Sequence, residues 1–186
     1  MNTANKITMI RVFLVPVFMV LFFIDNTVCH WAALGVFVLA SITDAIDGHV
    51  ARKYNQTTTF GKFVDPLADK VLTTAAFLML MYYGRMSVWA VMIILTREFM
   101  VAGVRLVAAG EGNVVAASIW GKLKTVSQMV AVIVAMILMN CELYFDKLFG
   151  IPSVIISDIL IWISVGFTII SGIDYLIKNW SLMKLK

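Results

Sequence analysis

The sequence predicts an all-α integral membrane protein, a bundle of six transmembrane helices with a polar cavity that faces the cytosol. The 186 residues are 61% hydrophobic and 14% charged, with a mean hydropathy of +0.93. Soluble domains are about half apolar and about a quarter charged. The apolar residues gather into six long segments, and in four consecutive segments the ionisable residues lie toward the same end. One domain over residues 1–186 accounts for this pattern.

The six apolar segments are long enough to cross a membrane, which takes about 20 residues per helix. Short polar connections separate them. The first segment follows Lys6 and contains Arg11 and Pro16, and no small-x-small cleavage site follows it. We therefore expect a retained helix rather than a signal peptide. The expected helices cover residues 7–24, 31–53, 61–83, 87–109, 117–140 and 151–178.

The basic residues predict the orientation, because cytoplasmic loops carry an excess of Lys and Arg. With six spans and an inside N-terminus, only Arg85 and Lys147 of the 15 basic residues lie outside. The other 13 lie on or toward the cytoplasmic side. The sequence thus predicts a multi-pass protein with both ends in the cytoplasm.

Two kinds of site are disfavoured by the sequence. No basic run interleaved with aromatic residues is present, so nucleic acid is not an expected partner. Cys29 and Cys141 lack the spacing of metal ligands. Both fall in loops expected on the outer side, where a disulfide would be compatible with their placement. Two unpaired thiols are the preferred interpretation.

Carboxylates at the end of the second expected helix lie below the membrane surface. Thirteen nonionisable residues, 31–43, precede Asp44. They span about 20 Å of a hydrocarbon core that is about 30 Å thick. A carboxylate costs about 2.5–3.5 kcal/mol or more at a helix centre. We therefore expect a compensating partner for Asp44, either within the bundle or in a cavity open to the cytosol.

Four aspartates share two helix faces. Asp44 and Asp47 are three residues apart, whereas Asp65 and Asp69 are four apart and continue a face that begins at Gly61. Two helices joined by a short turn bring these carboxylates together. Two divalent cations would offset their repulsion, and oxygen ligands suit Mg²⁺, Mn²⁺ or Ca²⁺. Such a pair is typical of displacement at phosphorus.

Small residues and one deep carboxylate complete this pattern. Gly48, Ala51 and Gly61 leave room for a bulky group such as a pyrophosphate close to the backbone. Asp69 lies deepest along its helix and has Lys70 beside it. We expect Asp69 to be free to take a proton from an attacking hydroxyl.

Basic residues predict a second wall for the same cavity. Arg97 and Arg105 lie about 80° apart around their helix, so both can face one cavity. Lys122 and Lys124 are about 200° apart, so one is expected to face inward and the other to meet lipid headgroups. This wall suits an anionic acceptor such as a phosphate. The alternative is that these residues only set topology and contact anionic lipid.

Other interpretations of the carboxylates are weaker. In a cation transporter or channel, acidic residues would line a route at several depths, whereas the main cluster here is confined to one level. A non-enzymatic scaffold leaves the aspartates unexplained. Glu98 is expected to pair with Arg97 or Lys70. Asp158 lies in the outer half of the sixth helix and fits only a dimer contact or a tilted helix.

The spacing of the aspartates is similar to the signature of the CDP-alcohol phosphotransferase family. The resemblance rests on Asp44-x-x-Asp47-Gly48-x-x-Ala51-Arg52, eight further residues, and Gly61-x-x-x-Asp65-x-x-x-Asp69. Every signature position is matched, and the chain length and six helices also fit. The resemblance implies a dimeric enzyme that transfers a phosphatidyl group from CDP-diacylglycerol to an alcohol and releases CMP.

The same resemblance implies roles for single residues. Two divalent cations, Mg²⁺ or Mn²⁺, would be held by Asp44, Asp47, Asp65 and Asp69. Asp69 would also be the catalytic base. The CDP moiety would be bound by Asn5, Asp47, Gly48, Ala51, Arg52 and Gly61. The implied setting is the bacterial cytoplasmic (inner) membrane, with membrane lipids and a second copy of the chain as partners.

Three segments, residues 63–70, 96–99 and 121–125, resemble the branch of this family that makes phosphatidylglycerophosphate. The implied acceptor is sn-glycerol 3-phosphate. Its phosphate would be bound by Arg97, Arg105, Lys122 and Lys124. The alternative within the family is another acceptor alcohol, such as inositol phosphate.

Overall fold

The computed structural model describes residues 3–53, 59–110, 118–142, 147–148 and 151–180, and side chains within residues 9–43, 70–108, 110, 118–142 and 152–180. These residues form six helices and two short strands. They are α1 (Thr3–Phe23), α2 (Thr27–Lys53), α3 (Thr59–Tyr82), α4 (Val88–Gly110), α5 (Ile119–Cys141), β1 (Lys147–Leu148), β2 (Ile151–Pro152) and α6 (Ser153–Lys178). The predicted all-α fold of six helices is confirmed. The strands were not predicted; they pair antiparallel through Leu148 and Ile151.

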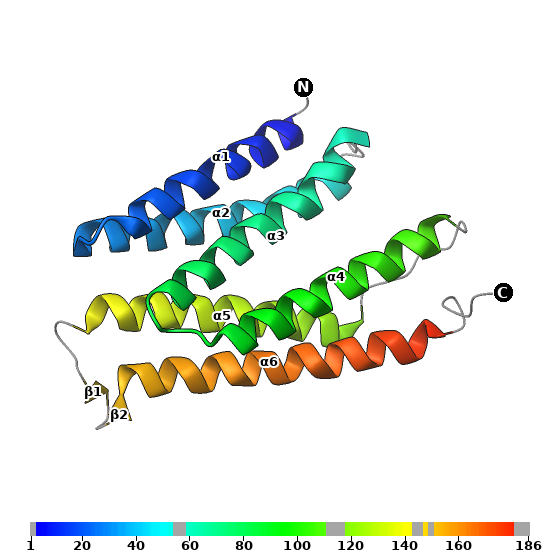
Figure 1. Ribbon diagram of the computed structural model, residues 1–186. Coiled ribbons are helices and arrows are strands. Elements are labelled where there is room, and N and C mark those ends of the chain that lie inside the picture. Colours follow the sequence, from blue (N-terminus) through cyan, green and yellow to red (C-terminus); the bar gives the residue numbers. More distant parts are fainter. Residues whose placement is uncertain (1–2, 54–58, 111–117, 143–146, 149–150, 181–186) are drawn as a thin grey trace.

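The helices alternate in direction along the bundle (Figure 1). The start of α1, the end of α2, the start of α3, the end of α4, the start of α5 and the end of α6 lie at one end, which we call the motif end. The other end holds residues 23–27, 83–87 and 141–142, and we call it the turn end. Both chain ends lie at the motif end, as an even number of crossings requires.

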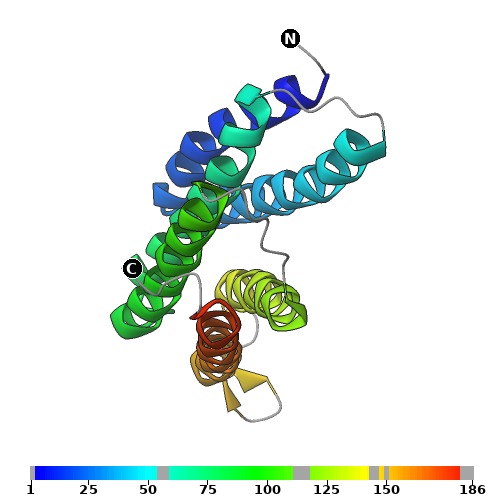
Figure 2. The same cartoon turned by 90° about the vertical axis from the view of Figure 1, so that its right-hand side faces the viewer.

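Two groups of three helices make up the bundle. α1 packs against α2 and α3, while α6 packs against α4 and α5. Figure 2 shows α1, α2 and α3 on one side of the bundle and α5 and α6 on the other. The groups meet where α2 contacts α5 and where α3 contacts α4 and α5. Helices α3 and α5 therefore join the two groups, because each of them contacts two helices of the other group.

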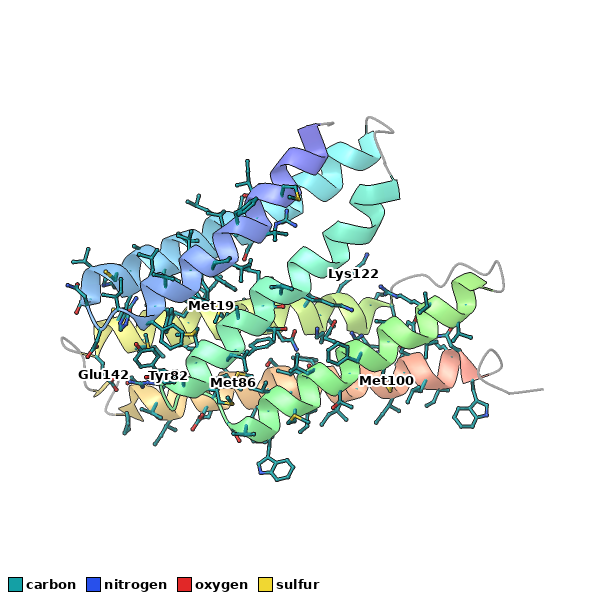
Figure 3. The ribbon with its side chains drawn as sticks, turned by 45° about the horizontal axis from the view of Figure 1, so that its top comes forward. Met19, Tyr82, Met86, Met100, Lys122 and Glu142 are labelled. Atoms are coloured by element: carbon teal, nitrogen blue, oxygen red, sulfur yellow. The ribbon has the colours of Figure 1, made fainter. Side chains whose placement is uncertain are left out.

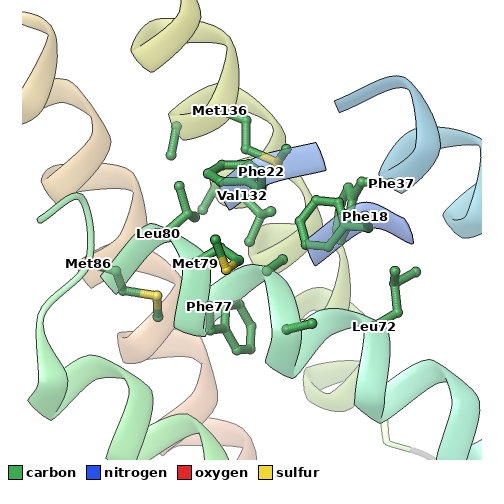
Figure 4. Packing of buried hydrophobic residues seen from close by; sticks show 14 of the residues in the cluster. Phe18, Phe22, Phe37, Leu72, Phe77, Met79, Leu80, Met86, Val132 and Met136 are labelled. Atoms are coloured by element: carbon green, nitrogen blue, oxygen red, sulfur yellow. The ribbon is translucent and has the colours of Figure 1, made fainter. Parts of the chain in front are cut away.

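An apolar core fills the junction between α1, α2, α3 and α5 (Figure 4). The Phe18 ring lies 5.4 Å from that of Phe22 and 5.9 Å from that of Phe37, centroid to centroid. Leu72 of α3 and Met136 of α5 are fully buried in the same cluster. Offset and tilted aromatic pairs of this kind stabilise a core beyond their buried area.

Hydroxyl residues make up much of the buried face of α6. Ser157, Ser164 and Thr168 donate back to backbone carbonyl oxygens within the helix, Thr168 to Ser164 at 2.7 Å. Gln128 of α5 donates to the Thr168 hydroxyl at 3.0 Å. Small residues let helices approach closely in a membrane, where packing and hydrogen bonds drive association. The buried hydroxyl residues of this face are Ser153, Ser157, Ser164, Thr168 and Ser171.

The outward surface is largely apolar, as expected for a protein surrounded by lipid. Large side chains such as Trp89 and Leu106 are exposed. Among the described side chains, α5 and α6 are each long and apolar enough to cross a membrane, and α1, α2 and α3 contain shorter apolar stretches. That all six helices span stays a prediction. The thiols of Cys29 and Cys141 are free, which confirms the preferred interpretation.

Replacing Phe18 by Ala should destabilise the bundle, because its side chain is fully buried between aromatic neighbours. A buried Phe→Ala change costs about 3–5 kcal/mol, which corresponds to a fall of about 6–20 °C in Tm for a chain of this size. Phe13→Ala, on the same helix but 68% exposed, should leave Tm nearly unchanged. Thermal unfolding of both purified variants in detergent measures the difference. Equal Tm values would contradict the packing described for α1.

Candidate active site

The four aspartates lie on two adjacent helices at the motif end. Asp44 and Asp47 belong to the last part of α2, and Asp65 and Asp69 to the first half of α3. The backbone is helical at all four positions, so the predicted spacing is that of helix faces. Their side chains lie outside the described part of the chain, as do those of the other residues predicted to bind CDP: Asn5, Gly48, Ala51, Arg52 and Gly61. Their roles stay predictions.

A network of ionic and hydrogen-bonding contacts joins α4, α5 and α6. The Glu98 carboxylate accepts a hydrogen bond from Nζ of Lys124 and lies 3.3 Å from Nη1 of Arg97. The Nη2 atom of Arg97 donates to Oγ of Ser171 at 2.7 Å. We call these four residues the Glu98 cluster. The side chains of Lys124, Arg97 and Glu98 are 6%, 12% and 20% exposed, so the ion pairs are shielded from water.

Two glycines allow the neighbouring helices to close on Arg97. A Cβ atom at Gly172 of α6 would lie 3.2 Å from Cγ of Arg97, which is tighter than ordinary van der Waals contact. A Cβ atom at Gly121 of α5 would lie 3.7 Å from Nη2 of the same residue. Ser118 caps α5 by accepting a hydrogen bond from the Gly121 N–H at 3.2 Å. The start of α5 is thereby fixed beside the guanidinium group.

The Glu98 cluster is linked to the aspartate-bearing helix α3. Lys70, the residue after Asp69, is close enough to Glu98 for an electrostatic interaction. The contacts of α3 with α4 and α5 bring the two regions together. Glu98 therefore interacts with both expected partners, Arg97 and Lys70, and also with Lys124.

The four basic residues predicted to bind the acceptor fall into two pairs. Arg97 and Lys124 belong to the Glu98 cluster. Lys122, labelled in Figure 3, is exposed, whereas Lys124 is buried, so one of the two lysines faces inward. Arg105 is also exposed, and its guanidinium carbon lies 5.9 Å from the centroid of the Tyr175 ring, a cation–π distance. A role for Arg105 and Lys122 toward an acceptor stays a prediction.

Ser171 and Gly172 were not singled out from the sequence. The signal that could have found them is the spacing of small residues in the sixth helix, where buried positions recur every three or four residues. In a membrane helix such a stripe marks a packing face. The stripe identifies the face but not the side chain it meets, here Arg97.

The charge and the hydrogen-bond donors of the Glu98 cluster suit an anion. One carboxylate faces two cations, so Arg97, Glu98 and Lys124 together carry a net positive charge. The Nε atom of Arg97 is buried and has no hydrogen-bond partner among the described residues. A guanidinium group with a spare donor is suited to bind a phosphate or carboxylate.

No metal-binding group of three or more His, Cys, Asp or Glu residues occurs among the described side chains. The four aspartates are not among those side chains. The donor set they offer consists of carboxylate oxygens alone, which fits a hard divalent cation such as Mg²⁺ or Mn²⁺.

Comparison with known proteins defines the class. Residues 1–170 match the CDP-alcohol phosphatidyltransferase family, and the chain belongs to this family. A Bacillus subtilis protein named CDP-diacylglycerol–glycerol-3-phosphate 3-phosphatidyltransferase is 42% identical, with 98% of this chain and 97% of the relative covered. Proteins of the same name from Rickettsia typhi and Wigglesworthia glossinidia brevipalpis are 38% and 33% identical, over 94% and 88% of this chain and 94% and 91% of their own.

Lys124→Met should destabilise the protein because it leaves Glu98 with one fewer buried partner. Breaking a buried ion pair from one side costs about 3–5 kcal/mol. Lys122→Met, the same change two residues earlier at an exposed position, should cost less than about 0.5 kcal/mol. Thermal unfolding in detergent compares the two variants. A larger loss for Lys122→Met would show that the network is not the one described.

Proposed function

We propose that this protein transfers a phosphatidyl group from CDP-diacylglycerol to sn-glycerol 3-phosphate, giving phosphatidylglycerophosphate and CMP. The observation that carries the proposal is the partly buried, net-positive Glu98 cluster beside the helix that holds Asp65 and Asp69. The family match and the names of the relatives support the same reaction.

The Glu98 cluster favours an acceptor that carries a phosphate. Arg97 has a spare buried donor, and Lys124 adds a second positive charge. Arg105 and Lys122 are exposed, which suits a role in attracting the anion before it reaches the cluster. A neutral alcohol would not require this wall, whereas inositol phosphate would also be compatible with it. The names of the relatives favour glycerol 3-phosphate.

The aspartates are proposed to hold two divalent cations, Mg²⁺ or Mn²⁺. Four carboxylates on facing helices would repel one another unless such charge is present. When bound, the cations would neutralise charge and polarise the transferred phosphoryl group. The ligands would be Asp44, Asp47, Asp65 and Asp69, with Asn5, Asp47, Gly48, Ala51, Arg52 and Gly61 around the CDP moiety.

Asp69 is proposed to act as the general base. Its carboxylate would accept the proton from the C1 hydroxyl of glycerol 3-phosphate. The hydroxyl oxygen then forms a bond to the phosphorus on the lipid side of CDP-diacylglycerol, and the bond from that phosphorus to CMP breaks. Arg97 would hold the acceptor phosphate, so that only the hydroxyl end of the acceptor reaches the reacting phosphorus.

We place the site on the cytoplasmic side of a bacterial inner membrane, with both chain ends inside. Support comes from the 13 basic residues expected on that side and from the position of both chain ends at the motif end. Residues 1–186 are proposed to act as one domain and to assemble as a homodimer, as the family resemblance implies.

The reaction is tested by CMP release from CDP-diacylglycerol by the purified protein in detergent with Mg²⁺ or Mn²⁺. Release should depend on glycerol 3-phosphate and not on glycerol or inositol phosphate. In Arg97→Met the KM for glycerol 3-phosphate should rise at least about tenfold, because a charge-assisted contact is lost, while the KM for CDP-diacylglycerol is kept. CMP release that depends on another alcohol instead would make the acceptor assignment wrong.

Asp69→Asn should remove turnover while largely preserving nucleotide binding, because an amide cannot accept the hydroxyl proton. Loss of a general base typically lowers the rate about 10²–10⁴-fold. Single-turnover kinetics measures the rate, and equilibrium binding of CDP measures the site. Asp158→Asn on α6 is the matched Asp-to-Asn control and should retain activity. Full activity of Asp69→Asn would exclude the proposed role.

A further inference from the structure

A polar cavity of about 610 Å³ lies at the turn end, away from the aspartate motif. It is formed where the α1–α2 connection, the α3–α4 turn and the end of α5 come together. Figure 3 shows Glu142 and Tyr82 close to this end of the bundle. We call this space the turn-end cavity. The polar side chains that line it include Asp25, His30, Tyr83, Arg85, Asn140 and Glu142.

Both carboxylate oxygens of Glu142 accept hydrogen bonds in this cavity. One of its carboxylate oxygens accepts a hydrogen bond from Nη2 of Arg85, and the other accepts one from Oγ of Ser153 at 3.0 Å. The charges of Arg85 and Glu142 therefore cancel.

Two buried polar side chains in the same wall keep unused atoms. Arg85 is 7% exposed, and its Nη1 atom has no hydrogen-bond partner in the described part of the chain. Asn140 is 3% exposed, and neither Oδ1 nor Nδ2 has a partner among those residues. Buried polar groups are nearly always hydrogen-bonded. Both residues line the cavity, so a bound group that accepts hydrogen bonds would satisfy the two donors, Nη1 of Arg85 and Nδ2 of Asn140.

A carboxylate lies at the rim. Asp25 is exposed and forms no ion pair with the described residues. It is close enough to the Tyr83 phenol for an electrostatic interaction. The Tyr83 hydroxyl donates to the Phe22 carbonyl at 2.8 Å and lies 3.4 Å from Nε2 of His30. Among the described side chains that line the cavity, Asp25 is the carboxylate without an ion-pair partner, because Glu142 is paired with Arg85.

The flanks of the rim are apolar. Phe23 and Ile24, which precede Asp25, and Tyr82, which precedes Tyr83, are exposed. The rings of Phe23 and Tyr82 meet edge to face at 5.4 Å. Aromatic and apolar residues at a helix end are typical of the membrane interface. A ligand with acyl chains would contact these residues, whereas a soluble ligand would leave them exposed.

We propose that the turn-end cavity binds the headgroup of a phospholipid that carries both a phosphate and a primary ammonium group, such as phosphatidylethanolamine. The phosphate accepts hydrogen bonds from Nη1 of Arg85 and Nδ2 of Asn140. The ammonium group pairs with Asp25. A phospholipid with a net negative charge, such as phosphatidylglycerol, brings a second anion toward Asp25 and is disfavoured. The cavity volume is in the range of small-molecule sites, about 300–1,000 Å³.

The lipid is tested by thermal unfolding of the full-length protein in detergent with equal mole fractions of phosphatidylethanolamine or phosphatidylglycerol. At about ten times its Kd, the zwitterionic lipid should raise Tm by about 3–6 °C more than the anionic one. Equal shifts for the two lipids would overturn the proposal. An equally large shift from soluble glycerophosphoethanolamine would show that the headgroup alone is recognised and that the acyl chains do not contribute. The bound ligand would then not be a membrane lipid.

Two substitutions in the cavity test the proposed lipid contacts, and one outside it is the control. Asp25→Asn, at an exposed position, should abolish the preference for phosphatidylethanolamine. Asp158→Asn, on the sixth helix beside Trp162 and outside the cavity, is the matched control and should retain the preference. Asn140→Leu should lose the shift from phosphatidylethanolamine. If Asn140→Leu does not fold, lipid binding to Asp25→Asn by native mass spectrometry still decides, because a retained preference in that variant contradicts the proposed ammonium contact.

Discussion

Glu98 holds two cations from two helices inside an apolar bundle, and the packing at the motif end depends on it. A charge at membrane depth is tolerated only when it is paired. Glu98 lies between the partly buried Arg97 and the buried Lys124 and pairs with both, and Ser171 accepts a further hydrogen bond from Arg97. Gly172 lets α6 approach the aliphatic part of the Arg97 side chain closely, because a Cβ atom there would lie 3.2 Å from Cγ of Arg97. The contacts that hold α4, α5 and α6 together thus also fix the orientation of Arg97.

The chemistry proposed for this protein is divided between the two helix groups. The carboxylates belong to α2 and α3, and the basic cluster belongs to α4 and α5 with support from α6. Lys70 follows Asp69 directly and interacts with Glu98 across the boundary. Because α3 packs against both α4 and α5, its position sets how far the aspartates lie from the acceptor phosphate. The contacts of the Glu98 cluster hold Arg97 in place, and this fixes the acceptor end of that distance.

Periodicity and composition were sufficient to predict the six helices and the pairing of Glu98 with Arg97. They also predicted that one of Lys122 and Lys124 faces inward. They could not predict which one, because the rotation of a helix depends on its neighbours. Ser171 was missed for the same reason, since a hydroxyl in a stripe of small residues does not indicate its partner. The turn-end cavity was missed because Arg85 was interpreted only as an outer-loop charge, whereas its burial arises from the meeting of three separate connections.

The Arg85–Glu142–Ser153 contact also constrains the order in which the bundle can be completed. Arg85 lies in the turn after α3, whereas Glu142 ends α5 and Ser153 begins α6. During synthesis from the N-terminus, the α3–α4 hairpin carries its guanidinium group without the Glu142 carboxylate until α5 has been made. The carboxylate in turn lacks its second donor until α6 begins. The final helix pair therefore completes a contact that all shorter nascent chains lack, which distinguishes a finished bundle from a partly inserted one.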